Sequence, residues 1–106
     1  MKKLFAVASF VWLASVSSLL AQAILLPIGS GPFAIELNQD ATLALVVNRN
    51  SNSVSIVNLA DNLIRNTITV GTFPTSVAIN PNTNQAVVTN YGSDNVSVID
   101  IGSATV

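Results

Sequence analysis

The sequence predicts an all-β fold, and three observations support this prediction. The 106-residue chain repeats itself at a spacing of 42 residues, so that residues 29–64 align with residues 71–106 without a gap. Each period contains four short runs rich in Val, Ile, Leu and Thr, and the runs are separated by Asn, Asp, Gly, Pro or Ser. Short apolar runs between turn-forming residues are typical of β-strands joined by tight turns.

Identical residues fix the register of the repeat. They include turn-forming glycine, proline and asparagine as well as aliphatic residues. The identical pairs are Gly29/Gly71, Pro32/Pro74, Asn38/Asn80, Ala44/Ala86, Val46/Val88, Asn48/Asn90, Ser51/Ser93, Val54/Val96 and Ser55/Ser97. Most other pairs in the apolar runs are conservative, such as Leu45 with Val87. We therefore expect both periods to fold into the same unit.

The four runs of one period predict four strands. The second run is almost continuously apolar, as expected for a strand covered on both faces, whereas the third alternates polar and aliphatic residues. The predicted strands and their counterparts are residues 33–37 and 75–79, residues 43–48 and 85–90, residues 54–59 and 96–101, and residues 64–70, which correspond to residues 26–28 and 104–106. We expect the second strand, residues 43–48, to pair with the first and third strands only.

Asparagine-rich turns join these strands. In the second period, residues 80–84 connect the first and second strands, and residues 92–95 connect the second and third. Asn and Asp favour such turns because they bond their own backbone and tolerate positive φ. Four strands in a repeat of roughly 40 residues is the pattern of a propeller blade. The sequence thus predicts a partial β-propeller of two four-stranded antiparallel blades, at residues 29–70 and 71–106, the second incomplete.

Two segments of the second period carry a family resemblance. Residues 71–91, GTFPTSVAINPNTNQAVVTNY, resemble the YVTN β-propeller repeat, with Val-Val-Thr-Asn in the place of Tyr-Val-Thr-Asn. Residues 96–100, VSVID, are similar to that repeat's third strand, and the first period is a looser copy with Leu-Val-Val-Asn at residues 45–48. The resemblance covers essentially all of the chain after residue 23. It implies an exported scaffold or surface protein, and a minority of similar propellers are lactonases or carry redox cofactors.

The first 23 residues have the pattern of a cleavable signal peptide. Lys2 and Lys3 precede an apolar run over residues 4–20 that only serines interrupt, and Ala21-Gln22-Ala23 supplies a small-x-small cleavage site. We expect a signal-peptide helix, cleavage after Ala23, and export of residues 24–106 to the periplasm, the cell surface or the medium. The alternative is an uncleaved anchor helix, because the apolar run approaches the length that crosses a bilayer.

Charge and composition exclude several classes of function. After residue 23 the basic side chains are Arg49 and Arg65, against five acidic ones, for a formal net charge of −3. A nucleic-acid binder or a peripheral membrane binder needs clustered Lys and Arg, which this segment lacks. The chain contains no cysteine, so disulfides and thiolate chemistry are excluded, and packing has to supply the stability.

Two blades leave large apolar faces uncovered. Fewer than about three repeats seldom bury enough surface to be stable, and exposed apolar faces favour association. We expect the chain to be a portion of a longer propeller, with further blades in cis covering these faces. The alternative is that several copies of the chain assemble into a ring.

Matched positions separate structural residues from candidates for binding. Asn48 and Asn90 end the second strand in both periods, which indicates a turn that every blade closes in the same way. The same argument assigns Gly29 with Gly71, and Pro32 with Pro74, to the segment before each first strand.

Matched positions that differ in chemistry are the candidates, because the scaffold does not dictate them. Arg49 corresponds to Tyr91, and Asn52 to Asp94. We expect Arg49, Tyr91 and Asp94 to lie on one face of the propeller as binding residues. The alternative is that they are ordinary exposed loop residues.

No catalytic, cofactor-binding or metal-binding residue is predicted. The chain has no histidine to act as a general base, no paired carboxylate motif and no glycine-rich phosphate loop. Oxygen ligands around residues 80–84 leave a hard-metal site open, although their spacing matches no calcium loop. We expect a non-catalytic extracytoplasmic scaffold or binding segment for a protein or carbohydrate at the cell envelope. The alternative is a fragment of a lactonase-like or quinoprotein-like propeller enzyme whose active residues lie in other blades.

Overall fold

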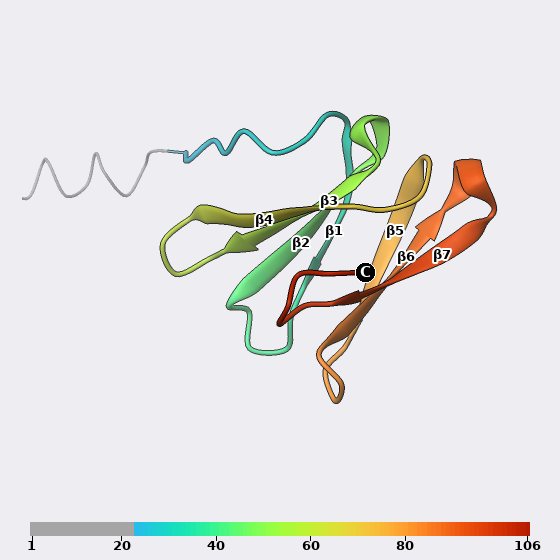
Figure 1. Cartoon of the computed structure of the whole chain (residues 1–106). Coiled ribbons are helices and arrows are strands. Elements are labelled where there is room, and N and C mark those ends of the chain that lie inside the picture. The colour runs from blue at the N-terminus through green and yellow to red at the C-terminus, as the bar shows by residue number, and fades with distance from the viewer. Residues whose placement is uncertain (1–22) are drawn as a thin grey trace, which may run out of the picture.

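The computed structural model describes residues 23–106, which form seven β-strands and no α-helix (Figure 1). The strands are β1 (Pro32–Leu37), β2 (Leu43–Asn48), β3 (Ser53–Asn58), β4 (Leu63–Thr69), β5 (Pro74–Asn80), β6 (Gln85–Asn90) and β7 (Asn95–Asp100). Two single-turn 3-10 helices, η1 (Arg49–Ser51) and η2 (Tyr91–Ser93), follow β2 and β6. The expected signal peptide, or anchor helix, lies outside the described residues apart from Ala23. Within residues 23–106, no helix has the length and hydrophobicity needed to traverse a bilayer.

The strands form two antiparallel sheets in simple sequential order. The first sheet has the order β1-β2-β3-β4, and the second has the order β5-β6-β7. Strand β2 pairs with β1 and β3 alone, and Val46 lies opposite Ile35 on one side and Ser55 on the other. These pairings confirm the expected strand order around residues 43–48. The predicted bounds of β2 and β6 are also those that the structure shows.

The second sheet has three strands, so the prediction of a fourth strand at residues 104–106 is wrong for this structure. After β7 the chain turns back, and Ala104 has a left-handed φ of 56°. The carboxylate of Asp100 accepts a hydrogen bond from the Ser103 amide at 3.0 Å, which closes the turn tightly. Thr105 therefore pairs with β7 only at its last residue, Asp100, in a single β-bridge.

Residues 26–28 are not a strand either, contrary to the prediction. The Ile28 amide donates to the carbonyl of Leu26 at 3.0 Å, so the segment bonds within itself rather than to a sheet. Leu26 and Ile28 nevertheless pack on the first sheet, against Ala44, Val46 and Val57. Apolar packing, without a ladder of backbone bonds, holds this segment in place.

The turns form for the reasons that their sequences predict. The Asn38 side chain accepts a hydrogen bond from the Leu43 amide at 2.8 Å and so closes the turn between β1 and β2. The Asn80 side chain accepts one from the Asn82 amide at 3.0 Å between β5 and β6. Asn62 and Asn84 adopt positive φ angles of 58° and 53°, which Asn tolerates better than most residues.

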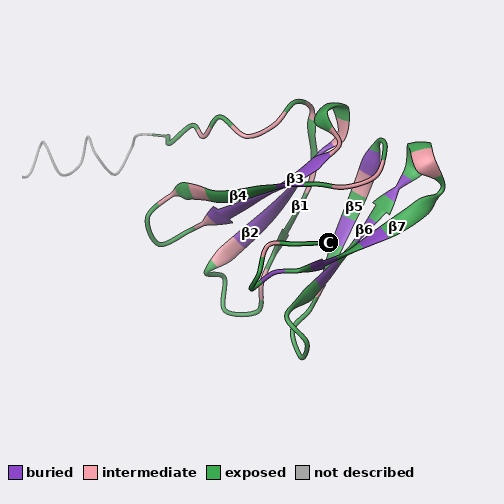
Figure 2. Cartoon of the chain, in the orientation of Figure 1, coloured by how far each residue is buried: buried purple, intermediate pink, exposed green. Residues whose placement is uncertain are grey.

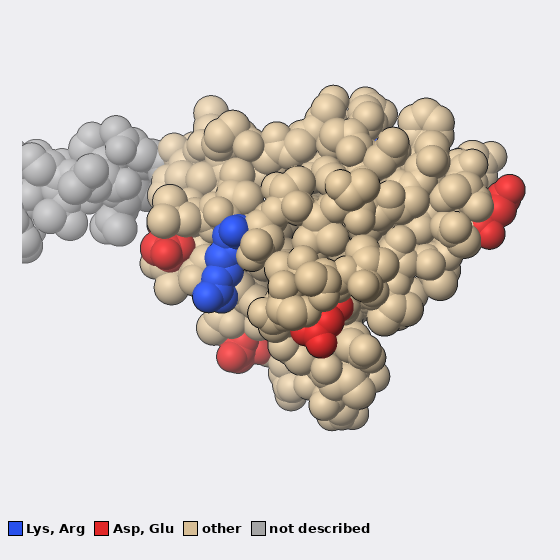
Figure 3. All heavy atoms as spheres, in the orientation of Figure 1, with Lys and Arg blue, Asp and Glu red and all other residues tan. Residues whose placement is uncertain are grey.

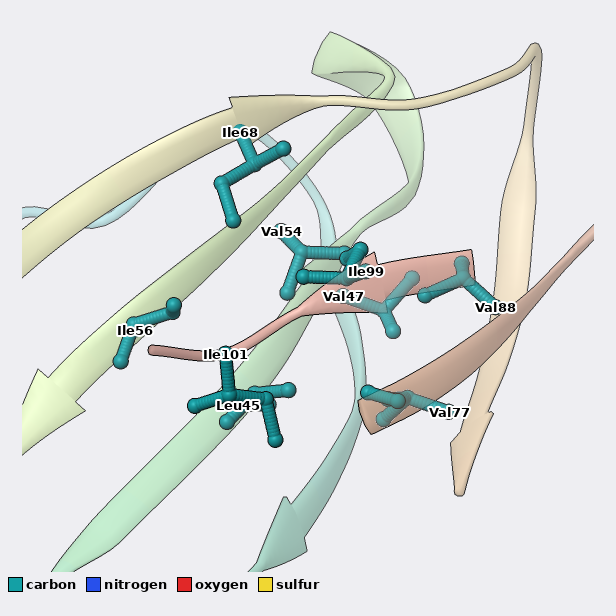
Figure 4. Packing of buried hydrophobic residues seen from close by; sticks show 10 residues of the cluster. Leu45, Val47, Val54, Ile56, Ile68, Val77, Val88, Ile99 and Ile101 are labelled. Carbon is teal, nitrogen blue, oxygen red and sulfur yellow. The ribbon is translucent and has the colours of Figure 1, made fainter. Parts of the chain in front are cut away.

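The hydrophobic core lies between the two sheets, which pack face to face (Figures 2 and 4). Side chains alternate along a strand, so every second residue of β2 points to the second sheet. The inner face of the first sheet is formed by Leu45, Val47, Val54, Ile56 and Ile68, and that of the second by Val77, Ala86, Val88, Ile99 and Ile101.

Each sheet also has an outer face, and the two are covered differently. The outer face of the first sheet consists of Ile35, Leu37, Ala44, Val46 and Val57, and Leu26, Ile28 and Ile64 cover part of it. The outer face of the second sheet consists of Val87, Thr89, Val96 and Val98, all exposed. Val96 is 57% exposed, whereas its repeat counterpart Val54 is fully buried.

Candidate binding surface

The turns that follow β2 and β6 lie at the same end of the two sheets, together with the segments that precede β1 and β5 (Figure 1). We call this region the turn end. Backbone hydrogen bonds tie each turn to the segment beside it. The Arg49 amide donates to the Gly31 carbonyl at 2.9 Å, and the Tyr91 amide donates to the Phe73 carbonyl at 3.0 Å. The sequence candidates Arg49 and Tyr91 are thus held in equivalent places.

A buried asparagine supports each turn. Asn48 Nδ2 donates to Ser53 Oγ at 3.2 Å and to Ser55 Oγ at 2.9 Å. Asn90 Nδ2 makes the corresponding bonds to Asn95 Oδ1 and Ser97 Oγ, each at 3.0 Å. Both asparagines are almost fully buried, and buried polar groups need such partners. The contacts support the structural role expected for both residues.

The glycines before each first strand make room for these asparagines. A Cβ on Gly29 would lie 2.7 Å from Asn48 Cγ and 2.6 Å from Ser51 Oγ. A Cβ on Gly71 would lie 2.6 Å from Asn90 Cγ. Only glycine lets the backbone pass this close to a buried side chain. The glycine and the asparagine are therefore repeated together, because the glycine leaves the space that the asparagine side chain occupies.

Arg49 lies between two phenylalanine rings at the turn end. Its Cζ atom is 5.0 Å from the centroid of Phe33 and 5.6 Å from that of Phe73. A guanidinium within about 6 Å of a ring centroid is attracted by the ring's quadrupole. Phe33 belongs to the first sheet and Phe73 precedes the second, so Arg49 bridges the two sheets. The Phe33 and Phe73 side chains are 56% and 44% exposed, and Arg49 is half-buried, so this cationic and aromatic surface is partly open to solvent.

Sequence reasoning missed Phe33 and Phe73, although a signal was present. Phe33 corresponds to Thr75 in the repeat, and Phe73 corresponds to Gly31. Both are therefore unmatched positions of the kind that identified Arg49. Each phenylalanine adjoins a proline that is matched in the repeat, and matched residues indicate a structural role for the segment.

Asn52 and Asp94 end the two turns in the same left-handed conformation, with φ angles of 53° and 56°. Asn52 Oδ1 accepts a hydrogen bond from the Phe73 amide at 3.0 Å, which links the first sheet to the segment before the second. The scaffold thus uses a side-chain oxygen at this position, and Asp94 also supplies one. Although Asn52 and Asp94 differ in charge, both provide a side-chain oxygen that can accept a hydrogen bond.

Tyr91 and Asp94 are brought together, whereas Arg49 lies apart from them. The tyrosine and the aspartate line an open hollow of ≈ 350 Å³ beside the outer face of the second sheet. Its other lining residues are Thr75, Thr89, Asn90, Asn95 and Val96. Tyr91 is 74% exposed and its ring is available for contact. Two separate patches therefore occupy the turn end, one around Arg49 and one around Tyr91.

Charged side chains are sparse on the surface and form no basic patch on the side that Figure 3 shows. Across residues 23–106, no group of three or more His, Cys, Asp or Glu side chains is placed to hold a metal ion. Asn80, in the segment considered for a hard metal, uses its side-chain oxygen to close its own turn.

Hydrogen bonds lower the pKa of two exposed carboxyl groups, both in turns. The Thr42 hydroxyl donates to Asp40 Oδ1 at 2.7 Å, and the Thr42 amide donates to the same oxygen at 3.3 Å. Together they hold the pKa of Asp40 below its ordinary value. The Ser103 amide, which donates to Asp100 Oδ1, lowers the pKa of Asp100 in the same way. Both carboxylates stabilise turns and lie away from the turn end.

Comparison with known proteins agrees with the fold. No family model matches the chain, and no curated protein matches it. A similar solved structure is that of Kuenenia stuttgartiensis Hydrazine Synthase, with a TM-score of 0.70 and 26% sequence identity. The similarity covers 80% of this chain and 24% of that chain, so the chain spans about a quarter of the matched protein. The likeness supports an all-β arrangement of stacked antiparallel sheets.

Proposed function

We propose that this chain is a non-catalytic β-propeller segment that binds a protein or carbohydrate at the cell envelope through its turn end. Two sheets of sequentially ordered antiparallel strands, stacked face to face, fit two blades of a propeller. The YVTN-like repeat and the signal-like N-terminus support an exported scaffold of this kind. Propeller scaffolds commonly bind their ligands with the turns at one end of the blades.

The observation that carries this proposal is Arg49 between Phe33 and Phe73. Arginine and aromatic side chains are enriched at binding interfaces, where they supply large contact areas and, for arginine, directional hydrogen-bond donors. Tyr91 forms a second patch at the same end of the sheets, beside the hollow that it lines with Asp94. We assign Arg49 and Tyr91 to ligand contact; Asp94 lines the hollow beside Tyr91.

Substitution of the two side chains assigned to ligand contact tests this function. The wild-type chain and an Arg49→Ala, Tyr91→Ala double variant are compared for binding to a glycan array and to immobilised proteins of the cell envelope. Saturable binding that weakens about 10-fold or more in the double variant supports the proposal. Asn82→Ala, in the exposed turn between β5 and β6, is the matched control and retains binding. Equal binding by the double variant, or no saturable binding, contradicts the proposal.

A second candidate function follows from the comparison with an enzyme. The matched chain is named as a synthase and is about four times as long as the segment that aligns with it. The parent protein would then be a propeller enzyme, lactonase-like or quinoprotein-like, with its active residues in blades outside this sequence. The coding sequence beyond residue 106 distinguishes the two. Further repeats with inward clusters of His, Glu or Arg favour an enzyme, whereas repeats that vary only in their turns favour binding.

A further inference from the structure

We propose that the outer face of the second sheet is a docking surface for a second copy of this chain. The second copy presents the outer face of its first sheet together with residues 24–28, and the contact repeats the packing that already joins the two sheets within one chain. This inference rests on that packing and on the repeat. It does not depend on the ligand proposed above.

Each of the two faces that pack together inside the chain has a repeat counterpart on an outer face. Shifting by 42 residues converts the inner face of the second sheet into the outer face of the first, and the inner face of the first into the outer face of the second. The corresponding residues of the first conversion are Val77/Ile35, Ile79/Leu37, Ala86/Ala44, Val88/Val46 and Ile99/Val57, and those of the second are Leu45/Val87, Val47/Thr89, Val54/Val96 and Ile56/Val98. Nearly every pair keeps its apolar character, so the two outer faces are complementary to each other.

On the outer face of the second sheet, and at Ile35 and Leu37 of the first, side chains are exposed whose repeat counterparts are covered. Val98 is 45% exposed, whereas Ile56 is 1% exposed. Ile35 is 63% exposed, whereas Val77 is 7% exposed. The difference comes from the neighbouring sheet and not from the residue type. A second copy, stacked as the second sheet stacks on the first, supplies the missing neighbour.

Residues 24–28 already lie where the docked arrangement needs them. Leu26 and Ile28 correspond to Ile68 and Val70 at the end of β4. Ile68 lies on the inner face of the first sheet, and Val70 packs against the same cluster between the two sheets. Leu26 and Ile28 cover the matching positions on the outer face of the first sheet. The segment therefore packs on the face of the first sheet that corresponds by repeat to the inner face of the second.

The outer edge of β7 can accept this segment as a fourth strand. Beyond β6, β7 makes one isolated bridge at Asp100, so the stretch from Asn95 to Ile99 has an open edge. An open edge presents unpaired N–H and C=O groups that an extended segment can satisfy. Residues 24–28 of a docked copy would complete the second sheet as β4 completes the first.

Pro27 is compatible with this pairing. It corresponds to Thr69 of β4. The Val70 amide donates to the Asn52 carbonyl at 2.9 Å, and antiparallel ladder bonds alternate along a strand, so the Thr69 amide points away from β3. A proline at that position removes no ladder bond.

A polar contact would fix the register of the two copies. Within the chain, Asn52 Oδ1 accepts a hydrogen bond from the Phe73 amide. Asp94 corresponds to Asn52, and Gly31 corresponds to Phe73. Gly31 has a φ of 64° and Phe73 a φ of 48°, so the two amides are presented alike. The carboxylate of Asp94 would therefore accept the Gly31 amide of the second copy.

The contact is head-to-tail, since it joins two different faces, and a mixing experiment tests this property. Val98→Lys disables the outer face of the second sheet, and Ile35→Lys disables that of the first. Both side chains are exposed in the single chain, so each variant folds, which far-UV circular dichroism verifies. We expect the full wild-type chain to form a discrete oligomer by light scattering, and each lysine to weaken assembly by roughly 100-fold or more.

Mixed in equal amounts, the two lysine variants should form a species of two chains, because each retains the face that the other lacks. Asn82→Lys, which places the same charge in an exposed turn, keeps the wild-type mass. A monomeric wild-type chain, a Val98→Lys variant with wild-type mass, or a mixture that stays monomeric overturns the proposal.

The polar contact has its own matched pair of variants. Asp94→Gly preserves the left-handed conformation but removes the carboxylate, and it should weaken assembly by roughly 10-fold without altering the unfolding of the single chain. Asn52→Gly removes the internal equivalent and should lower the stability of the single chain. Assembly by Asp94→Gly at wild-type strength counts against the proposed pairing of Asp94 with Gly31.

Discussion

At the scale of the residue, the repeat separates what the fold requires from what it leaves free. Asn48 and Asn90, with the glycines that pack on them, are identical because both make equivalent buried contacts. Their structural role was predictable from one comparison of the chain with itself. The stacking of Arg49 on Phe33 and Phe73 was not, because it joins residues from two sheets and depends on how the sheets pack.

Replacing Asn48 tests the buried hydrogen bonds directly. Asn48→Ala removes both bonds from Nδ2 and leaves two serine hydroxyls without their buried partner. The free energy of unfolding should fall by about 1–3 kcal/mol, measured by urea denaturation. Asn82→Ala, at an exposed turn position, should change it by less than about 0.5 kcal/mol. A loss as small as the control's would show that the bonds of Asn48 are dispensable.

Replacing Gly71 tests the close approach of backbone and asparagine. In Gly71→Ala the new Cβ would lie 2.5 Å from Ser93 Oγ and 2.6 Å from Asn90 Cγ, so Asn90 has to move. We expect a loss of about 1–3 kcal/mol in a urea melt. Gly102→Ala is the matched control, since its Cβ would meet Asp100 Oδ1 at an ordinary 3.4 Å. Equal stability of the two variants would refute the explanation.

At the scale of the element, strands were predicted well and chain ends poorly. Residues 43–48 and 85–90 coincide with β2 and β6 because apolar runs between asparagines define both ends of a central strand. Residues 26–28 and 104–106 were expected to be strands because their counterpart, β4, is one. Residues 26–28 have no neighbouring strand beside them among the described residues, and residues 104–106 turn back too tightly to run along β7. Neither the absence of a neighbour nor the tightness of the turn can be derived from the match with β4.

The turn carboxylates make stability depend on acid pH. Hydrogen bonds in the folded state lower the pKa of Asp40 and Asp100 below the ordinary value of 3.8. Their stabilising effect is therefore complete above that value and is lost as the pH falls through the lower folded-state pKa. Unfolding by urea at a series of pH values below about 5 should show a decline that Asp40→Asn and Asp100→Asn both reduce. A decline as steep in both variants as in the wild type would assign the effect to other groups.

At the scale of the whole molecule, stacking of the two sheets supplies most of the core. Equivalent residues differ in burial according to whether another sheet covers them, as Val54 and Val96 show. The sequence correctly indicated that two units leave apolar faces uncovered. It could not show which faces these are, because the direction of each side chain follows from strand pairing.

A matched pair of truncations tests the contribution of stacking. Val54→Ala should lower the free energy of unfolding by about 2 kcal/mol, because it leaves a cavity between the sheets. Val96→Ala, at the equivalent position, should change it by less than about 0.5 kcal/mol. Both are measured by urea denaturation on the Val98→Lys background, which removes contact between copies. Similar losses in the two variants would contradict the unequal burial.

The conformation of Phe73 has a mechanical consequence for the molecule. This bulky residue has a φ of 48°, and both its amide and its carbonyl are engaged, by Asn52 and Tyr91 respectively. Because the first partner belongs to the leading sheet and the second to the following one, the connection between them cannot swivel freely. These two hydrogen bonds restrict rotation of the connection between the first sheet and the second. Together with the core between the sheets, this connection constrains the angle at which one sheet follows the other.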